Sequence, residues 1–386
     1  MKKIKAMTVF GTRPEAIKMA PLIKTLRKYE QFESIVCVTA QHREMLDQVL
    51  DIFEIKPDYD LNIMQARQTL ADITTRAMQG LYKIFDETKP DIVLVHGDTT
   101  TTFAASLAAF YSKVKVGHVE AGLRTYDKYS PYPEEMNRKL TGSIADLHFA
   151  PTVANKENLI KENVSEKEIY VTGNTVIDAL ASTVSEDYKF SDSFLSNYSF
   201  DNKRVVLVTC HRRENFGTPF ENIFSALFRL VGDLPDIEII YPVHLNPVVR
   251  EPATRILGNN SRIHLIEPLN VQDMHNLMAR SYLIMTDSGG LQEEAPSLGK
   301  PVLVLRNETE RPEAVKAGTV KLAGTNEADV YNEAYNLLTN NEEYQKMARA
   351  INPYGDGNAS VRIAEALLYH FGLTDKRPEE FIAAKN

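Results

Sequence analysis

The sequence predicts an α/β protein with two doubly wound domains, each a parallel sheet covered by helices. Short runs rich in Val, Ile and Leu alternate with longer segments of helical period, as in βαβ units. This alternation occurs twice, and a polar stretch without clear periodicity, 186–203, separates the two halves. The length of 386 residues also exceeds what one hydrophobic core usually organises. We therefore expect a linker at this stretch and one domain on each side.

The first half begins with a predicted strand at 3–10 and a predicted helix at 14–29. Continuous apolar runs bounded by turn residues are typical of strands that are buried on both faces of a parallel sheet. The other predicted strands of this half are 34–40, 91–97, 115–121 and 147–151, with a second clear helix at 43–53.

The alternation restarts after the polar stretch. Predicted strands follow at 204–210, 237–244, 262–268, 282–288, 300–306 and 319–324. Helical period is clearest at 220–234 and 271–281, and an amphipathic helix is expected at 361–371. The second half therefore repeats the architecture of the first.

Composition narrows the class of partner. A formal net charge of -8 argues against a general nucleic-acid binder or a binder of anionic membranes, so we expect a small-molecule substrate or a protein partner. The two cysteines, Cys37 and Cys210, fit buried thiols in a reducing compartment, and no C-x-x-C spacing suggests a metal site. Because no apolar run reaches the length of a membrane span and the N-terminus lacks a signal-peptide pattern, we expect a cytoplasmic protein.

Two carboxylates follow predicted strands of the first half. Open α/β sheets bind ligands outside the carboxyl ends of their strands, and Asp98 and Glu120 come directly after such runs. On adjacent strands they would face one crevice and could divide acid and base roles. The alternative is that each caps a following helix. That alternative fits Asp98, because threonines 99–102 open a helix, but it fits Glu120 poorly, because 121–135 does not begin one directly.

The second half carries a Ser-Gly-Gly turn, 288–290, between a predicted strand and a predicted helix. Its glycines would let the backbone approach a phosphate at a helix start, although a plain tight turn uses the same residues. Cationic side chains expected near strand ends would favour a diphosphate; they are Arg13, His211, Arg212, Arg213 and Arg311. No G-x-G-x-x-G follows a strand and no Walker A motif occurs, so neither NAD nor ATP hydrolysis is indicated and no cofactor is expected. The H-x-D and H-x-E pairs at 96–98 and 118–120 are interpreted as packing histidines beside the carboxylates rather than as metal ligands, so no metal is expected.

Seven segments together carry a family resemblance: "VFGTRPEAIKMAPL", "TAQHREMLDQVL", "VHGDTTTT", "GHVEAGLRT", "PEEMNR", "HRREN" and "TDSGGLQEEAPSLGKPVLVLR". Over nearly its whole length the sequence strongly resembles the non-hydrolysing bacterial UDP-N-acetylglucosamine 2-epimerases. The resemblance implies a GT-B-like fold of two Rossmann-like domains with the active site in the interdomain cleft. It implies an N-terminal domain at 1–175, a nucleotide-binding domain at 200–360, a C-terminal helix at about 361–376 that packs back on the first domain, and a homodimer.

The same resemblance implies the reaction and its residues. The reaction would be reversible conversion of UDP-GlcNAc to UDP-ManNAc, by anti elimination of UDP to a 2-acetamidoglucal and re-addition, with the product supplied to cell-wall or capsule polysaccharide. The implied catalytic residues are Asp98, Glu120, Glu134 and His211. The implied substrate-binding residues are Arg13, Lys18, Ser288, Gly289, Gly290, Arg311, Glu294 at the ribose and Met274 where many relatives carry an aromatic residue beside the uracil. A second UDP-GlcNAc, bound as an activator, would contact Gln41, His42 and Arg67.

Three other functions remain open at this point. A GT-B glycosyltransferase would use the same nucleotide site but pass the sugar to an acceptor, and a hydrolysing epimerase would release UDP and free ManNAc. A nucleotide-sugar sensor would keep the binding residues without turnover, which the intact set of acidic residues argues against.

Overall fold

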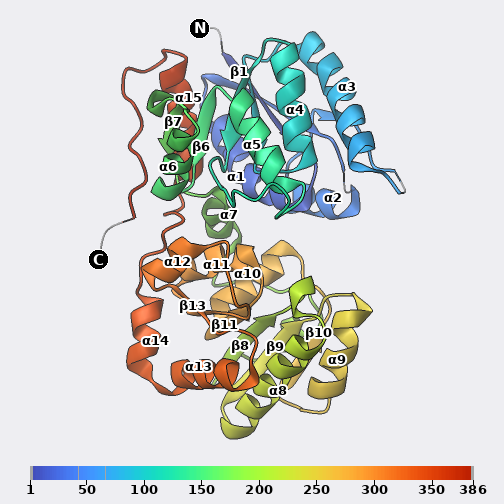
Figure 1. The fold of residues 1–386 in the computed structure, drawn as a ribbon, viewed down its shortest axis with the longest axis vertical. Helices are drawn as coiled ribbons and strands as arrows, with labels where there is room; N and C mark the ends of the chain where they lie inside the picture. The colour runs from blue at the N-terminus through green and yellow to red at the C-terminus, as the bar shows by residue number, and fades with distance from the viewer. Residues whose placement is uncertain (1–2, 42, 66, 384–386) are drawn as a thin grey trace. The chain divides into compact units, whose positions relative to one another are not determined.

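The computed structural model describes residues 3–41, 43–65 and 67–383. The chain divides into two compact units, one made of Met1–Ser182 with Tyr354–Ile382 and the other built on Thr183–Pro353. Each unit has its own sheet, in which every strand pairs in parallel with its neighbours (Figure 1). Two parallel sheets covered by helices confirm the predicted fold class.

The first unit has a seven-stranded sheet of order β3-β2-β1-β4-β5-β6-β7. Its strands are β1 (Ile4–Phe10), β2 (Phe32–Val38), β3 (Tyr59–Asp60), β4 (Ile92–His96), β5 (Lys115–Val119), β6 (Leu147–Ala150) and β7 (Ile169–Val171). Its helices are α1 (Arg13–Lys28), α2 (Arg43–Ile52), α3 (Leu70–Thr88), α4 (Thr100–Tyr111), α5 (Glu134–Ile144), α6 (Val153–Lys161), α7 (Thr175–Thr183) and α15 (Ala359–His370). The strand order reverses direction between β1 and β4, and such a switch point is where sheets of this kind open a crevice at their carboxyl edge.

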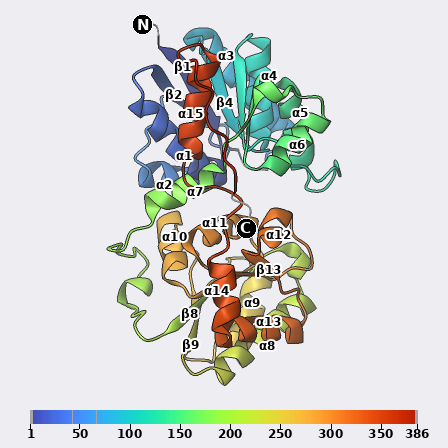
Figure 2. The ribbon, with the colours of Figure 1, turned by 90° about the vertical axis from the view of Figure 1, so that its left-hand side faces the viewer.

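Both faces of this sheet are covered. Met7 and Val9 of β1 join one apolar cluster with α3 and α4, which include Leu81 and Ala105. Because side chains alternate along a strand, the intervening residues of β1 point to the opposite face. There α1 contacts β1 and β4, and α15 lies beside α1 (Figure 2). Burial on both faces explains why these strands are continuous apolar runs rather than alternating ones.

The second unit has a six-stranded sheet of order β10-β9-β8-β11-β12-β13. Its strands are β8 (Arg204–Thr209), β9 (Ile237–Pro242), β10 (Ile263–Ile266), β11 (Leu283–Thr286), β12 (Val302–Val304) and β13 (Val320–Leu322). Its helices are α8 (Thr218–Asp233), α9 (Pro247–Leu257), α10 (Val271–Arg280), α11 (Gly289–Glu294), α12 (Pro312–Ala317), α13 (Glu327–Thr339) and α14 (Asn341–Ala348). Buried side chains of α8 and α13 form one hydrophobic core with side chains of the strands. The order again reverses between β8 and β11, so their carboxyl ends mark the crevice of this unit.

The polar stretch expected as a linker, 186–203, is packed against the second unit. Phe190 and Leu195 are buried. The Asp273 carboxylate of α10 accepts hydrogen bonds from the backbone N–H groups of Ser191 and Asp192, at 2.9 and 3.0 Å. The second unit begins at Thr183, and these hydrogen bonds, with the Arg280 guanidinium over the Phe190 ring, hold the stretch against it.

All the predicted strands are confirmed, whereas β3 and β7 were not predicted. With two residues, β3 is too short to show a pattern, whereas β7 is a three-residue apolar run like β12 and could have been predicted. None of the helices in the described ranges combines the length and the apolar character that crossing a bilayer requires.

Candidate functional site

Asp98 and Glu120 lie at the same edge of the first sheet. Strands β4 and β5 pair in parallel from Ile92 with Lys115 to His96 with Val119, so the residues that follow them share one edge. A Cβ built on Gly97 would lie 3.6 Å from Oε1 of Glu120, which places the Glu120 carboxylate against the segment that carries Asp98.

Glu120 has a backbone conformation that residues other than glycine rarely adopt. Its φ is +62°, in the left-handed region, which costs about 1–3 kcal/mol for a residue other than glycine. Its side chain is only 9% exposed, and its Oε2 accepts a hydrogen bond from Asn174 Nδ2 at 2.9 Å. Because surrounding contacts must hold such a conformation in place, the position of the carboxylate is set by the fold.

The charge of Glu120 is matched by two neighbours. Lys18 Nζ donates to Oε2, and His96 Nε2 lies 3.6 Å from the same oxygen. Burial, the largest single effect, raises the pKa of Glu120, but the charge and hydrogen bond of Lys18 and the nearby imidazole of His96 together hold that pKa well below its usual range. The structure thus provides an ionised carboxylate inside the protein. His118 supports the same loop, since its Nε2 lies 2.7 Å from the Gly97 carbonyl oxygen.

Asp98 does not cap α4, contrary to the simpler interpretation of the sequence. The N-cap is Thr99, whose hydroxyl accepts from the Thr102 N–H at 3.1 Å. The Asp98 carboxylate accepts instead from Arg138 Nη2 at 2.6 Å, with the Asp98 side chain 28% exposed. The carboxylate is therefore available for a role other than ending a helix.

Helix α5 brings Glu134 to this edge. Its Asn137 donates from Nδ2 to the Asp98 carbonyl oxygen at 2.9 Å, so the first turns of α5 are fixed to the end of β4. Glu134, the first residue of the helix, is half-buried. Its neighbour Glu135 is buried, binds Arg138 at 3.2 Å and accepts from the Thr125 N–H at 3.1 Å, which ties the preceding loop to the helix.

Arg13 and Lys18 lie in the first half of α1, which starts directly after β1. Burial lowers the pKa of Arg13. The buried carboxylate of Glu15 accepts from the N–H groups of Gly11 and Thr12, at 3.0 and 2.8 Å. It also accepts from the Thr99 hydroxyl at 2.7 Å, and so joins the loops after β1 and β4. The T-x-x-E spacing of Thr12 and Glu15 is a capping-box signal that could have identified this role.

The three residues assigned to an activator site differ in their contacts and exposure. Gln41 Oε1 accepts from the Thr101 hydroxyl at 3.1 Å, next to the start of α4. Arg67 is exposed and has a φ of +57°, and the adjacent Gln68 donates to the Gln41 carbonyl oxygen at 3.4 Å. The structure thus brings the segments of Gln41 and Arg67 together, and His42 lies outside the described residues.

In the second unit, Asp287 organises the end of β8. This residue is fully buried, and its Oδ2 accepts from the N–H groups of His211 and Arg212, at 2.8 and 2.7 Å. Its Oδ1 lies 3.5 Å from His211 Nδ1. Burial lowers the pKa of His211, although Asp287 opposes that effect, and the ring stacks on His244 at 5.6 Å between centroids. Sequence reasoning missed Asp287, although it directly follows β11 as Asp98 nearly follows β4.

Two guanidinium groups lie at the start of α11. A Cβ built on Gly289 would lie 3.7 Å from Arg311 Nη2 and 3.8 Å from Arg212 Nη2. Arg311 is oriented by the buried carboxylate of Glu293, which accepts from its Nε. A missing side chain at Gly289 and two cations beside it suit an anion with several oxygens.

Ser288, Gly290 and Glu294 complete this turn. Ser288 is the N-cap residue of α11, and its N–H donates to Thr286 Oγ1 at 2.9 Å. A Cβ built on Gly290 would lie 3.4 Å from Glu294 Oε1. Met274, the residue assigned to the uracil, is half-buried on α10.

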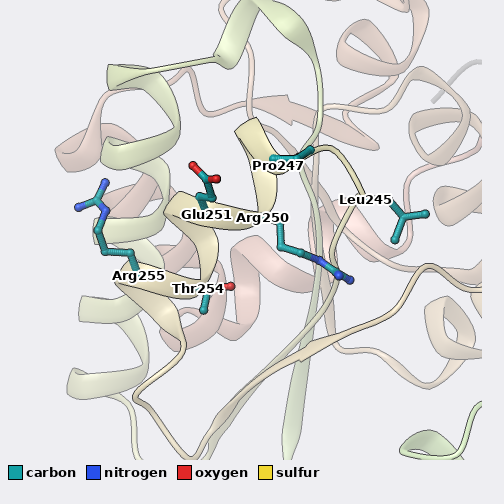
Figure 3. A pocket seen from close by; sticks show the side chains of 6 residues that line it. All are labelled: Leu245, Pro247, Arg250, Glu251, Thr254 and Arg255. Carbon is teal, nitrogen blue, oxygen red and sulfur yellow. The ribbon is translucent and has the colours of Figure 1, made fainter.

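A groove outside these residues lies against α9. It has a volume of about 650 Å³ and is lined by Leu245, Pro247, Arg250, Glu251, Thr254 and Arg255 (Figure 3). Two of its arginines already pair with carboxylates, Arg250 with Glu267 and Arg255 with Glu221. None of the predicted site residues lines this groove. Nowhere in the described ranges do three His, Cys, Asp or Glu side chains gather so as to hold a metal ion.

Comparisons with known proteins show which family the chain belongs to. The family model described as UDP-N-acetylglucosamine 2-epimerase matches residues 24–368. The UDP-N-acetylglucosamine 2-epimerase of Bacillus subtilis strain 168 is 62% identical over 381 residues, which cover 99% of each chain.

Solved structures are equally similar. An S. aureus MnaA co-structure with UDP has a TM-score of 0.88 and 54% identity, and it covers 99% of this chain and 100% of that one. The UDP-GlcNAc 2-epimerase of Neisseria meningitidis, bound to UDP-GlcNAc, has a TM-score of 0.86 and 53% identity, and it covers 95% of this chain and 100% of that one. The shared fold is GT-B-like, with two Rossmann-like domains. The chain therefore belongs to the UDP-N-acetylglucosamine 2-epimerase family.

Proposed function

We propose that this protein is a non-hydrolysing UDP-N-acetylglucosamine 2-epimerase that interconverts UDP-GlcNAc and UDP-ManNAc. The observation that carries the proposal is the pair of carboxylates at one sheet edge, Glu120 held ionised by Lys18 and His96, and Asp98 paired with Arg138. Family membership and the relative bound to UDP-GlcNAc support the substrate.

The reaction explains why carboxylates and a diphosphate site occur together. Inverting C2 requires loss of a proton that no neighbouring carbonyl acidifies. If the C1–O bond to UDP breaks first, UDP leaves with the electron pair of that bond, and the positive charge left at C1 makes the C2 proton acidic. A carboxylate then takes that proton, and the C–H electron pair forms the C1=C2 bond of 2-acetamidoglucal. Return of UDP and protonation of C2 from the other face gives the epimer.

The proposal assigns the sugar end of the substrate to the first unit. Asp98, Glu120 and Glu134 would transfer protons at the two faces of C2. An ionised Glu120 is ready to accept a proton, while the salt bridge from Arg138 keeps Asp98 oriented at the same edge. Each positioned acid or base contributes roughly 10²–10⁴-fold to the rate.

The proposal assigns the nucleotide end to residues of the second unit, and it names Arg13 and Lys18 of α1 as further substrate-binding residues. Departing UDP carries negative charge, which His211, Arg311 and the turn at 288–290 would stabilise. Glu294 would accept from the ribose and Met274 would cover the uracil. Fixed cations and N–H groups would stabilise the negative charge that develops on UDP as the C1–O bond breaks.

Several further properties belong to the same proposal. The enzyme would act as a cytoplasmic homodimer without a cofactor and supply ManNAc units to cell-wall or capsule polysaccharide. A second UDP-GlcNAc would bind as an activator near Gln41, His42 and Arg67. The hydrogen bond between Gln41 and Thr101, and the one from Gln68 that joins the segments of Gln41 and Arg67, support that second site.

The test is incubation of the protein with UDP-GlcNAc alone in D₂O, followed by NMR. We expect UDP-ManNAc with deuterium at C2 and no net release of UDP. Release of UDP with free ManNAc would replace the proposal by a hydrolysing enzyme, and an unchanged sugar would refute epimerisation. An Asp98→Asn variant with near-normal turnover would remove Asp98 from the mechanism.

A further inference from the structure

The imidazole of His275 joins two parts of the second unit. His275 lies on α10 and is 2% exposed. Its Nδ1 is 2.6 Å from the Thr183 hydroxyl, and its Nε2 is 3.5 Å from Oε2 of Glu294. One ring nitrogen thus faces the last residue of α7 and the other faces the carboxylate assigned to the ribose.

These contacts select one tautomer of the ring. A neutral imidazole has one donor nitrogen and one acceptor nitrogen. If Nδ1 carried the proton, the lone pair of Nε2 would face a carboxylate oxygen, which is repulsive. A hydroxyl can donate to Nδ1, so the favourable arrangement has Thr183 donating to Nδ1 and Nε2–H directed at Glu294.

Glu294 is held between this ring and the glycine turn. Its side chain is 12% exposed, with Oε2 toward His275. Its other oxygen, Oε1, lies 3.4 Å from where a Cβ of Gly290 would be. The oxygen that His275 does not contact therefore faces the turn where the proposed function puts the nucleotide.

The far side of the ring is anchored as well. The next residue on α10, Asn276, donates from Nδ2 to the Thr183 carbonyl oxygen at 2.8 Å and accepts from the Ser185 N–H at 3.0 Å. Thr183 is consequently fixed to α10 by its backbone and by its hydroxyl. A donor held at both ends loses little freedom when it orients a carboxylate.

We propose that His275 is a positioning residue that orients Glu294 to accept from a ribose hydroxyl and so makes the protein select ribonucleotides. This rests on the proposed function, which assigns the ribose to Glu294. Hydrogen bonds to a charged group change affinity by roughly ten- to a hundredfold. Loss of the ring should therefore cost about tenfold or more in preference for the ribose, while the phosphate contacts persist.

The test compares UDP with 2′-deoxy-UDP and 3′-deoxy-UDP in calorimetric titrations. We expect the native protein to bind UDP about tenfold or more tightly than at least one deoxy analogue. Glu294→Gln and His275→Phe should each bring that ratio close to one, and the double variant should lose no more than either single variant. The matched control is His264→Gln, which removes another imidazole paired with a carboxylate, Glu238 at 2.7 Å, and should keep the native ratio.

Two further measurements keep the inference open to refutation. Thermal unfolding shows whether His275→Phe is folded, and Thr183→Val, which keeps the ring but removes its hydroxyl donor, should also lower the ratio. Equal binding of UDP and both analogues by the native protein, or a full native ratio in a folded His275→Phe protein, would overturn the inference. Normal ribose selection in a protein that leaves UDP-GlcNAc unchanged would refute the proposed reaction but not this role of His275.

Discussion

Replacing Lys18 by methionine tests whether charge holds Glu120 ionised. The two side chains are 14% and 9% exposed, so solvent screens their attraction little. Removing one partner of a buried ion pair costs roughly 3–5 kcal/mol in the free energy of unfolding. His96 and Asn174 remain beside the carboxylate, at 3.6 and 2.9 Å, so we expect the lower end, about 3 kcal/mol. For a unit of this size that lowers Tm by about 6–12 °C.

The pH dependence should change in a defined direction. In the native protein the pKa of Glu120 is held below its ordinary value of 4.5, so its contribution to stability is complete above that pH and is lost as pH falls through the folded pKa. Without Lys18, burial still raises the pKa and less charge opposes it. The folded pKa then rises toward the ordinary value, so the pH-dependent contribution to stability is smaller and its loss is complete at a higher pH. The acid limb of epimerase activity should move the same way, because the proposed role requires an ionised Glu120.

The assay is urea unfolding at several pH values together with the pH profile of kcat for UDP-GlcNAc. Lys28→Met is the matched control, since Lys28 is an exposed residue of the same helix and its removal should change stability by less than about 1 kcal/mol. A Lys18→Met protein with the native unfolding free energy and an unmoved acid limb would refute the assignment of Lys18 as the partner that keeps Glu120 charged.

Three other substitutions test the remaining supports of the site. Arg138→Met should reduce kcat by about 10²-fold or more and change KM less, because Asp98 loses its 2.6 Å partner. A native kcat in steady-state assays would exclude a role of Arg138 in orienting Asp98. Gly11→Ala should destabilise the protein by about 2 kcal/mol or more in urea unfolding, because a Cβ there would lie 2.1 Å from a threonine hydroxyl oxygen. Asp287→Asn should weaken binding of UDP in calorimetry by about tenfold, because Asp287 accepts from the His211 N–H at 2.8 Å and fixes that loop; unchanged affinity would place its role elsewhere.

The fold was predictable because burial on both faces leaves a strong local signal. Strands such as β4 and β8 are runs of Val, Ile and Leu, and any strand covered by helices on both sides must have that composition. The two-residue β3 leaves no such signal, whereas the apolar run of β7 is as long as that of β12 and could have been predicted. The stretch 186–203 shows a related limit: its composition is polar, but Phe190 and Leu195 are buried and Asp273 of α10 binds its backbone.

The candidate site was predictable only where chain position itself carries the information. The carboxyl ends of parallel strands must share an edge, so the neighbourhood of Asp98 and Glu120 followed from the alternation alone. Their partners did not, because Arg138 and Asn174 lie far along the chain and look like ordinary helix and loop residues until the fold brings them close. Asp287 directly follows a strand and could have been found by the same rule that identified Glu120.

The two carboxylates also differ in a way that their sequence positions do not indicate. Glu120 is 9% exposed and receives a lysine from α1, whereas Asp98 is 28% exposed and receives an arginine from α5. A reversible epimerisation needs proton transfer at opposite faces of one carbon, and equal carboxylates on both faces would give no reason for either to begin protonated or ionised. Separate partners from separate helices let the fold set the two environments independently. Under the proposed function, that independence, more than the presence of acidic residues, would suit this sheet edge to moving a proton across C2.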